Sequence, residues 1–325
     1  MPLTDLPHEE LLRYRPEAAG PADLDAFWDG TLAGARAHGD GGARVTPVAG
    51  SLLRSVDVYD VRFPGFGGEP VAAWLLVPRG AEGRRPAVVE YLGYSQGRGL
   101  PVERLLFASA GYVSLVVDSR GQGNDTPDPH PGGPQWVGGF MTRGVESPEG
   151  YYYRRLYTDA VRAVDFVRGL PQVDPDRVVV AGGSQGGALA LAAAALADGL
   201  VAAALVDVPF LQHVRRAVEI SSDGPYREVA EYLRFHSRGN VEQTFATLAY
   251  ADGMHLAPRA TAPALFSAAL MDPVCPPSTV FASYHRYGGK ADMEVWPFGD
   301  HAGGRSSQQQ RQLEWLRDHG LGVAD

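Results

Sequence analysis

The chain has 325 residues, a formal net charge of −9 and a 45% share of apolar residues, which is the composition of an ordinary globular protein. The acidic balance argues against nucleic acid as a partner and against an anionic membrane surface. No apolar run approaches the roughly 20 residues of a membrane span. The single cysteine, Cys275, allows no disulfide within the chain. The acidic, proline-broken N-terminus lacks the form of a secretory signal, so we expect a cytoplasmic protein.

Residues 1–50 carry helical patterns, with Leu24, Phe27, Trp28 and Leu32 on one face. We expect an N-terminal helical extension that packs on the main domain.

The next two segments have the pattern of strands. Residues 54–62 alternate apolar and polar side chains, as a half-exposed strand does. Residues 70–77, Pro-Val-Ala-Ala-Trp-Leu-Leu-Val, form a second run that follows Gly67-Gly68. We expect the two runs to pair as an antiparallel hairpin.

Strongly apolar runs then alternate with helical stretches such as Tyr152–Leu170. The runs are residues 87–91, 112–118, 177–182, 201–207, 264–272 and 293–297. Parallel strands buried on both faces read as continuous apolar runs. Their alternation with helices implies one sheet covered on both faces. We predict a single α/β domain over residues 1–325 with a mostly parallel central sheet.

Two segments depart from this alternation. Residues 208–262 lie between two of the apolar runs and carry charged helical patterns. We interpret them as a helical insertion over the carboxyl edge of the sheet, near the active site. Residues 121–150 form a loop rich in glycine and proline, and long ordered loops of that kind usually shape a site.

Residues 177–194 combine a β-branched run, a serine flanked by glycines and an alanine-rich helix. The core, Gly182-x-Ser184-x-Gly186, lies between strand and helix, which is the context of a nucleophile elbow. Such a tight turn tolerates almost no side chain at Gly182, Gly186 and Gly187, and it strains the Ser184 backbone. A phosphate-binding loop would place a lysine before the serine, and this chain has none there. The pattern predicts a serine hydrolase.

A serine hydroxyl needs a general base, and the base needs an orienting carboxylate. In α/β-hydrolases they follow in the order serine, acid, histidine. Asp272 ends one apolar run, and His301 follows the next run in a glycine-rich loop. Asp207 also ends a run and is the rival for the acid. We prefer Asp272 because its strand directly precedes the strand before His301.

Two backbone amides are candidates for the oxyanion hole. The N–H of Gln185, directly after the nucleophile, is one. The other should come from the loop after residues 86–91, where Tyr94 is the candidate and Gly93 and Ser95 are alternatives. Cys275 is interpreted as a buried thiol rather than a nucleophile. No two histidines have metal-ligand spacing.

With these residues identified, the chain resembles carbohydrate esterase family 7, the acetyl xylan esterases and cephalosporin-C deacetylases. The similarity covers nearly the whole chain. The stretches that carry it are Asp5-Leu-Pro, Tyr14-Arg-Pro, Arg120-Gly-Gln122, Gly139–Gly144, Tyr151–Arg155, Gly182–Gly186, Asp207–Phe210, Cys275–Thr279 and the His301 loop.

The resemblance implies an α/β-hydrolase fold and removal of acetyl groups from acetylated xylo-oligosaccharides and small esters such as cephalosporin C. It implies a triad of Ser184, Asp272 and His301, with Tyr94 and Gln185 as oxyanion donors. It further implies no cofactor, no metal, a cytoplasmic location and a ring-like hexamer built from dimers.

One departure from the family pattern lies beside the proposed base. The family usually has a glutamate directly after the catalytic histidine, and this chain has Ala302. Two other functions stay open: a different α/β-hydrolase activity, such as a peptidase or general carboxylesterase, and a non-catalytic binding protein with a hydrolase fold. The complete, ordered set of serine, aspartate and histidine argues against the last.

Overall fold

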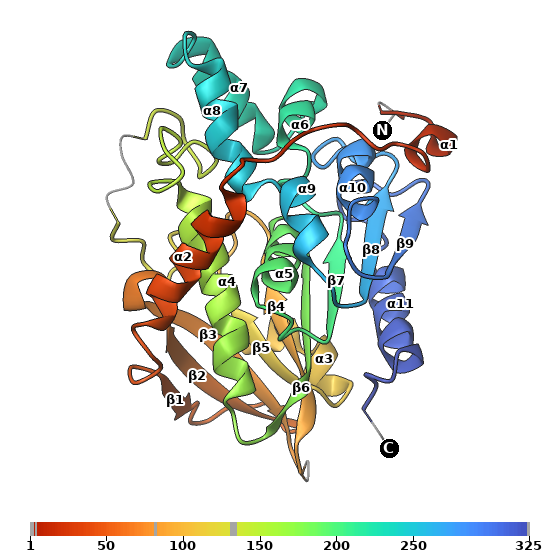
Figure 1. Cartoon of the computed structure of the whole chain (residues 1–325). Helices are drawn as coiled ribbons and strands as arrows, with labels where there is room; N and C mark the ends of the chain where they lie inside the picture. Colours follow the sequence, from red (N-terminus) through yellow and green to blue (C-terminus); the bar gives the residue numbers. More distant parts are fainter. Residues whose placement is uncertain (1–2, 4, 81–82, 131–134, 324–325) are drawn as a thin grey trace.

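The computed structural model describes residues 3, 5–80, 83–130 and 135–323. Within that part of the chain, nine strands form one sheet in the order β1-β2-β3-β5-β4-β6-β7-β8-β9 (Figure 1). The strands are β1 (Arg44–Pro47), β2 (Val56–Pro64), β3 (Pro70–Pro78), β4 (Arg85–Tyr91), β5 (Val113–Val117), β6 (Val173–Gly183), β7 (Ala203–Asp207), β8 (Ala264–Ala269) and β9 (Ala291–Trp296).

The sheet is mostly parallel, as predicted. β4 to β9 run parallel to one another, whereas β2 pairs antiparallel with both β1 and β3, and β3 pairs antiparallel with β5. The predicted hairpin is therefore confirmed as β2 and β3. β1 lies inside the range expected to be helical, and its four residues are all exposed. A short exposed edge strand has no apolar alternation to reveal it.

Helices cover both faces of the sheet. They are α1 (His8–Leu11), α2 (Leu24–Arg36), α3 (Leu106–Ser109), α4 (Tyr152–Arg168), α5 (Gln185–Leu196), α6 (Val214–Ile220), α7 (Tyr226–Phe235), α8 (Val241–Leu248), α9 (Gly253–Leu256), α10 (Pro277–Tyr284) and α11 (Arg305–Asp318), with 3₁₀ turns η1 (Phe66–Gly68), η2 (Pro101–Arg104), η3 (Ala249–Ala251) and η4 (Ala257–Arg259). The pleat explains the two layers, because successive side chains point to opposite faces. Val89 belongs to the core under α2, α4 and α5, and its neighbour Val88 belongs to the core under α3 and α11.

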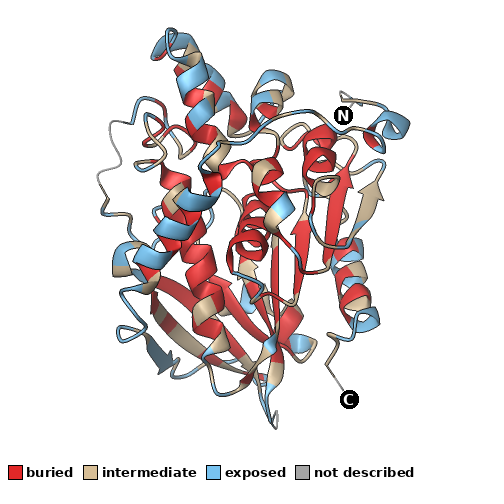
Figure 2. Cartoon of the chain, viewed as in Figure 1, coloured by how far each residue is buried: buried red, intermediate tan, exposed pale blue. Residues whose placement is uncertain are grey.

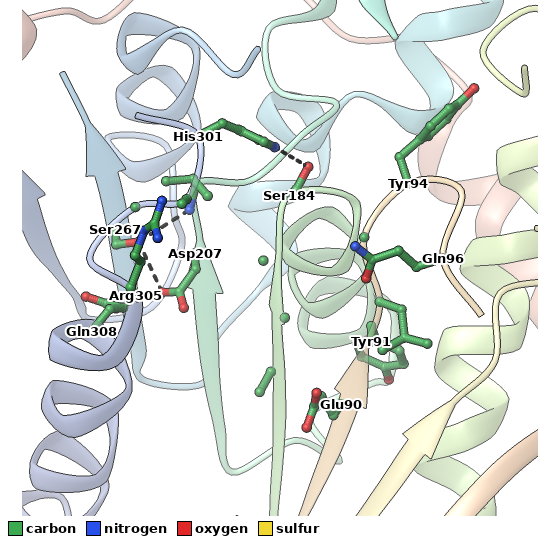
Figure 3. A pocket seen from close by; sticks show the side chains of 18 of the residues that line it. Glu90, Tyr91, Tyr94, Gln96, Ser184, Asp207, Ser267, His301, Arg305 and Gln308 are labelled. Carbon is green, nitrogen blue, oxygen red and sulfur yellow. Dashed lines mark hydrogen bonds between the residues drawn. The ribbon is translucent and has the colours of Figure 1, made fainter. Parts of the chain in front are cut away.

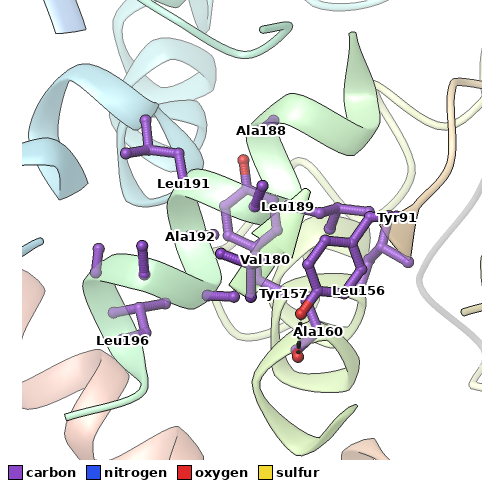
Figure 4. Packing of buried hydrophobic residues seen from close by; sticks show 14 of the residues in the cluster. Tyr91, Leu156, Tyr157, Ala160, Val180, Ala188, Leu189, Leu191, Ala192 and Leu196 are labelled. Atoms are coloured by element: carbon purple, nitrogen blue, oxygen red, sulfur yellow. Dashed lines mark hydrogen bonds between the residues drawn. The ribbon is translucent and has the colours of Figure 1, made fainter. Parts of the chain in front are cut away.

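Among the described helices, α5, which follows Ser184, is the most buried. Every residue of α5 is buried (Figure 2), and a helix that is apolar all round belongs inside a protein. Its alanines and leucines pack near α4, as Figure 4 shows. Behind them, the Tyr91 hydroxyl donates to the Ala160 carbonyl oxygen at 2.8 Å. This packing holds the elbow rigidly at the centre of the sheet.

The segment 208–262 contains α6, α7, α8 and α9. Figure 1 shows α6, α7 and α8 beyond the carboxyl ends of the strands. The described part of residues 121–150 contains neither helix nor strand. Among the helices of the described residues, none is long and apolar enough to cross a bilayer.

Candidate active site

Ser184 lies at the turn between β6 and α5, with φ 57° and ψ −121°. This conformation is strained for a residue with a side chain. The turn is so tight that a Cβ on Gly182 would lie 2.4 Å from the Gly186 carbonyl oxygen. A Cβ on Gly186 would lie 2.3 Å from the Tyr91 oxygen, and one on Gly187 would lie 2.8 Å from a backbone oxygen. The close contacts explain the glycines that the sequence pattern singled out.

The structure brings together the three residues proposed as a triad. His301 Nε2 lies 2.9 Å from Ser184 Oγ, as Figure 3 shows. His301 Nδ1 lies 2.8 Å from Asp272 Oδ2. The Asp272 side chain is fully buried, whereas the His301 side chain is 30% exposed. The imidazole therefore has solvent on one side and a buried acceptor on the other.

Backbone amides orient the Asp272 carboxyl group. Its Oδ1 accepts hydrogen bonds from the N–H of Val274 at 2.8 Å and of Cys275 at 2.9 Å. Its Oδ2 is left for His301. A carboxylate accepts hydrogen bonds, so this contact places a proton on His301 Nδ1 and leaves Nε2 free to accept the Ser184 proton. Asp272 lies just beyond β8, which ends at Ala269; the predicted apolar run extended to Asp272 itself.

The rival carboxylate, Asp207, contacts side chains other than His301. Its Oδ1 accepts from Gln308 Nε2 at 2.7 Å and from Ser267 Oγ at 3.1 Å. Its Oδ2 accepts from Gln312 Nε2 at 2.5 Å. Burial raises the pKa of Asp207 to about 7. Both oxygens are thus engaged by polar neighbours other than His301.

The two candidate oxyanion donors lie on adjacent segments. Gln185 begins α5, and the first N–H groups of a helix have no partner within it. Ser95, one of the alternatives to Tyr94, donates its N–H to Gln122 Oε1 at 2.6 Å. Among the described residues, the Tyr94 N–H makes no backbone hydrogen bond. Tyr94 and Gly93 therefore remain for the loop's contribution.

Gln122 joins these two segments, a role that sequence reasoning did not identify. Besides accepting from Ser95, it donates from Nε2 to Gln185 Oε1 at 2.7 Å and to the Tyr152 hydroxyl at 2.9 Å. The Gln185 side chain in turn donates from Nε2 to the backbone oxygens of Leu92 and Gly93, each at 3.3 Å. The only sequence signal for Gln122 was that it belongs to Arg120-Gly-Gln122, one of the stretches that resemble the family.

Ser184 and His301 open into a cavity of about 760 Å³. In Figure 3, Tyr94 and Gln96 lie on one side of Ser184, and Asp207 and Gln308 lie on the other. Pro225, Glu228, Val274 and Ala302 also line the cavity.

One group of side chains at the site could hold a metal ion. Donor atoms of Asp272, Cys275 and His301 lie within 4.8 Å of one another. Asp272 and His301 already share a hydrogen bond, and an ion would have to displace it. Burial and the neighbouring Asp272 carboxylate raise the pKa of the Cys275 thiol. A protonated thiol is a poor metal ligand and a poor nucleophile.

Two acetyl xylan esterases of known structure are similar to this chain in both fold and sequence. The acetyl xylan esterase of Paenibacillus sp. R4 is 39% identical and superposes with a TM-score of 0.92, over 96% of this chain and 99% of that one. Acetyl xylan esterase 1 of Thermoanaerobacterium sp. JW/SL YS485 is 31% identical, with a TM-score of 0.89, over 98% and 100% of the two chains.

A more distant relative agrees with them. Acetyl esterase Axe7A of Xylanibacter ruminicola is 27% identical over 326 residues, which cover 95% of this chain and 69% of the relative. These matches confirm the α/β-hydrolase fold predicted from the sequence. A family model for acetyl xylan esterases matches residues 1–319. The chain therefore belongs to the acetyl xylan esterase family, carbohydrate esterase family 7, and is a carboxylic ester hydrolase.

Proposed function

We propose that this chain removes acetyl groups from acetylated xylo-oligosaccharides and related small esters such as cephalosporin C, through an acetyl-Ser184 intermediate. The observation that carries the proposal is the continuous hydrogen-bond chain from Ser184 Oγ through the His301 ring to Asp272, with distances of 2.9 and 2.8 Å. Its Ser184 and His301 members line a cavity of about 760 Å³, which is large enough for a sugar unit. The net charge of −9 favours a neutral substrate over a polyanion.

The first half of the reaction forms the acetyl-enzyme. His301 Nε2 takes the proton of Ser184 Oγ as this oxygen bonds to the ester carbonyl carbon. The resulting oxyanion accepts hydrogen bonds from the N–H groups of Tyr94 and Gln185. The carbon–oxygen bond to the alcohol then breaks, and the alcohol leaves with the proton from His301.

Water completes the cycle. It gives one proton to His301 Nε2, and its oxygen attacks the acetyl carbonyl. The bond to Ser184 Oγ then breaks as this oxygen takes the proton from His301, and acetic acid leaves and ionises in solution. Throughout, Asp272 stabilises the imidazolium and holds the ring orientation without taking a proton itself.

The shape of the cavity supports a preference for short acyl groups. Tyr94 and Pro225 both line the cavity that Ser184 enters, and we expect these two rigid rings to restrict the room for a long acyl chain. We expect p-nitrophenyl acetate to have a higher kcat/KM than the octanoyl ester. The reverse order would refute the acetyl assignment while leaving esterase activity in place.

The nucleophile is tested by Ser184→Ala, with the exposed Ser109→Ala as matched control. We expect Ser184→Ala to lower kcat on p-nitrophenyl acetate by a factor of about 10⁴–10⁶. The variant should also no longer be labelled by a fluorophosphonate probe. More than a tenth of the wild-type rate would reject this assignment. A wild-type chain that the probe does not label would instead be a binding protein, and activity on peptide anilides above that on esters would favour a peptidase.

We also propose assembly as a ring-like hexamer built from dimers and a cytoplasmic location. The family resemblance supports the assembly, and the cytoplasmic location is supported by the resemblance and by the single cysteine, which allows no disulfide within the chain. Analytical ultracentrifugation tests the assembly: a monomer at micromolar concentration would contradict it.

A further inference from the structure

The side chain of Tyr94 is held by a residue of the helical insertion. Its hydroxyl donates to the Glu228 carboxylate, with distances of 2.7 Å to Oε1 and 2.9 Å to Oε2. Glu228 belongs to α7, far along the chain from the loop that carries Tyr94. In Figure 3 the Tyr94 phenol oxygen points away from Ser184. The side chain therefore faces the insertion while the residue itself borders the nucleophile.

A third segment meets the same pair of side chains. The N–H of Phe140 donates to the Tyr94 hydroxyl oxygen at 2.5 Å, and the N–H of Met141 donates to Glu228 Oε2 at 3.0 Å. The chain approaches closely here because Gly139 has φ 99°, and a Cβ on it would lie 2.2 Å from the Glu228 carboxylate. Insertion, long loop and oxyanion loop are thus tied together at one phenol and one carboxylate.

The protonation of the pair suits these hydrogen bonds. Burial raises the pKa of Glu228, and the hydrogen bonds from Tyr94 and Met141 oppose that shift. Burial and Glu228 raise the pKa of the Tyr94 phenol, so that it keeps the proton that it donates.

We propose that Glu228 is a positioning residue for the oxyanion hole: through the Tyr94 hydroxyl it holds the Tyr94 backbone N–H where the oxyanion forms. The inference rests on the proposed function, in which this N–H is one of the two donors. Oxyanion stabilisation depends on donors within hydrogen-bond reach of an oxygen that exists only in the transition state. Loss of the anchor should therefore lower kcat more than it changes KM.

The experiment compares Glu228→Ala, Glu228→Gln and Tyr94→Phe with the control Glu231→Gln, which changes an exposed carboxylate on the same helix. Steady-state kinetics on p-nitrophenyl acetate give kcat and KM. Titration with the fluorophosphonate gives the fraction of competent sites, so that partly unfolded protein does not count as slow enzyme.

We expect Glu228→Ala to lower kcat about 10- to 100-fold, since a donor displaced by about 1 Å loses much of its effect. KM should change by less than about threefold, because a ground-state carbonyl depends little on the oxyanion donors. Glu228→Gln should restore most of the rate. Its amide oxygen can take the place of Oε2, which alone accepts from both Tyr94 and Met141.

The route through the phenol is tested by the double variant Glu228→Ala/Tyr94→Phe. If Glu228 acts through the hydroxyl, the double variant is no slower than the slower single one. Effects that multiply would overturn the proposal, as would a Glu228→Ala enzyme with the kcat of the Glu231→Gln control. Should Glu228→Ala not fold, an unchanged kcat in Tyr94→Phe overturns it equally. Failure of the proposed function is a separate result, because it appears as an inactive wild type or an active Ser184→Ala.

Discussion

Two aspartates at neighbouring strand ends have opposite surroundings. Asp207 is the last residue of β7, and its carboxyl group is enclosed by Ser267 and two glutamines of α11. Asp272 lies in the turn after β8, where two backbone N–H groups and His301 surround it. The same side chain at the same edge of one sheet is a helix anchor in one place and a partner of histidine in the other.

The pleat explains the difference. Leu205 belongs to the core under α11, and side chains two residues apart share a face. Asp207 therefore points toward α11, below the level of the histidine loop. Asp272 lies beyond the last strand residue, Ala269, so the strand alternation no longer directs its side chain. Asp272 can therefore turn toward His301 because it lies beyond the pleated strand, whereas the pleat of β7 directs Asp207 toward α11.

The sharpest test of this comparison is Asp272→Asn. The amide cannot hold His301 in the tautomer that accepts the Ser184 proton, so we expect kcat on p-nitrophenyl acetate to fall by about 10³–10⁴. Asp207→Asn should reduce kcat by less than about tenfold, because it changes no contact of His301. If the two variants exchanged these effects, our choice of acid would be wrong.

Asp207 should show itself in stability instead. Its folded-state pKa of about 7 lies above the unfolded value of about 3.9. Between those two values the folded chain keeps a proton that the unfolded chain releases, so stability falls as pH rises and levels off above pH 7. The full loss is about 4 kcal/mol at about 1.4 kcal/mol per pKa unit.

Urea unfolding at pH 5 and pH 8 measures this term. The difference in unfolding free energy between wild type and Asp207→Asn should move by about 3 kcal/mol against the wild type over that range. The asparagine variant removes this titration and keeps an acceptor for Gln308, so its unfolding free energy at each pH is the reference for the wild type. A difference independent of pH would mean that Asp207 is ionised throughout.

The smallest effect is expected when a third carboxylate is added, by Ala302→Glu. Ala302 is exposed. Two hydrogen bonds hold its loop. The Ala302 N–H donates to the Asp300 side chain at 2.9 Å, and the Gly303 N–H donates to the Asp300 carbonyl oxygen at 2.9 Å. Asp272 already orients His301. We therefore expect kcat to change by less than about tenfold, or about 1.4 kcal/mol. A hundredfold rise in steady-state kcat would show that the triad as drawn lacks a needed group.

Much of the architecture was predictable because it rests on local patterns. The continuous apolar runs predicted the parallel strands, and the glycines around Ser184 predicted the strained turn. The exposed edge strand at residues 44–47 was not predictable, since its pairing with β2 is independent of any periodicity in its own four residues.

By itself, the sequence determined the position of the elbow, the order of the candidate serine, aspartate and histidine, and the family. These features depend on residues that lie close together in the sequence, such as the strand, turn and helix around Ser184. Only the tertiary structure decided which aspartate faces His301, that Gln122 bridges the two segments proposed to form the oxyanion hole, and that Glu228 reaches Tyr94. Each of these contacts joins segments distant in sequence. The physical reason is that a side chain's partner is set by the direction in which the backbone presents it, and that direction follows from packing across the sheet.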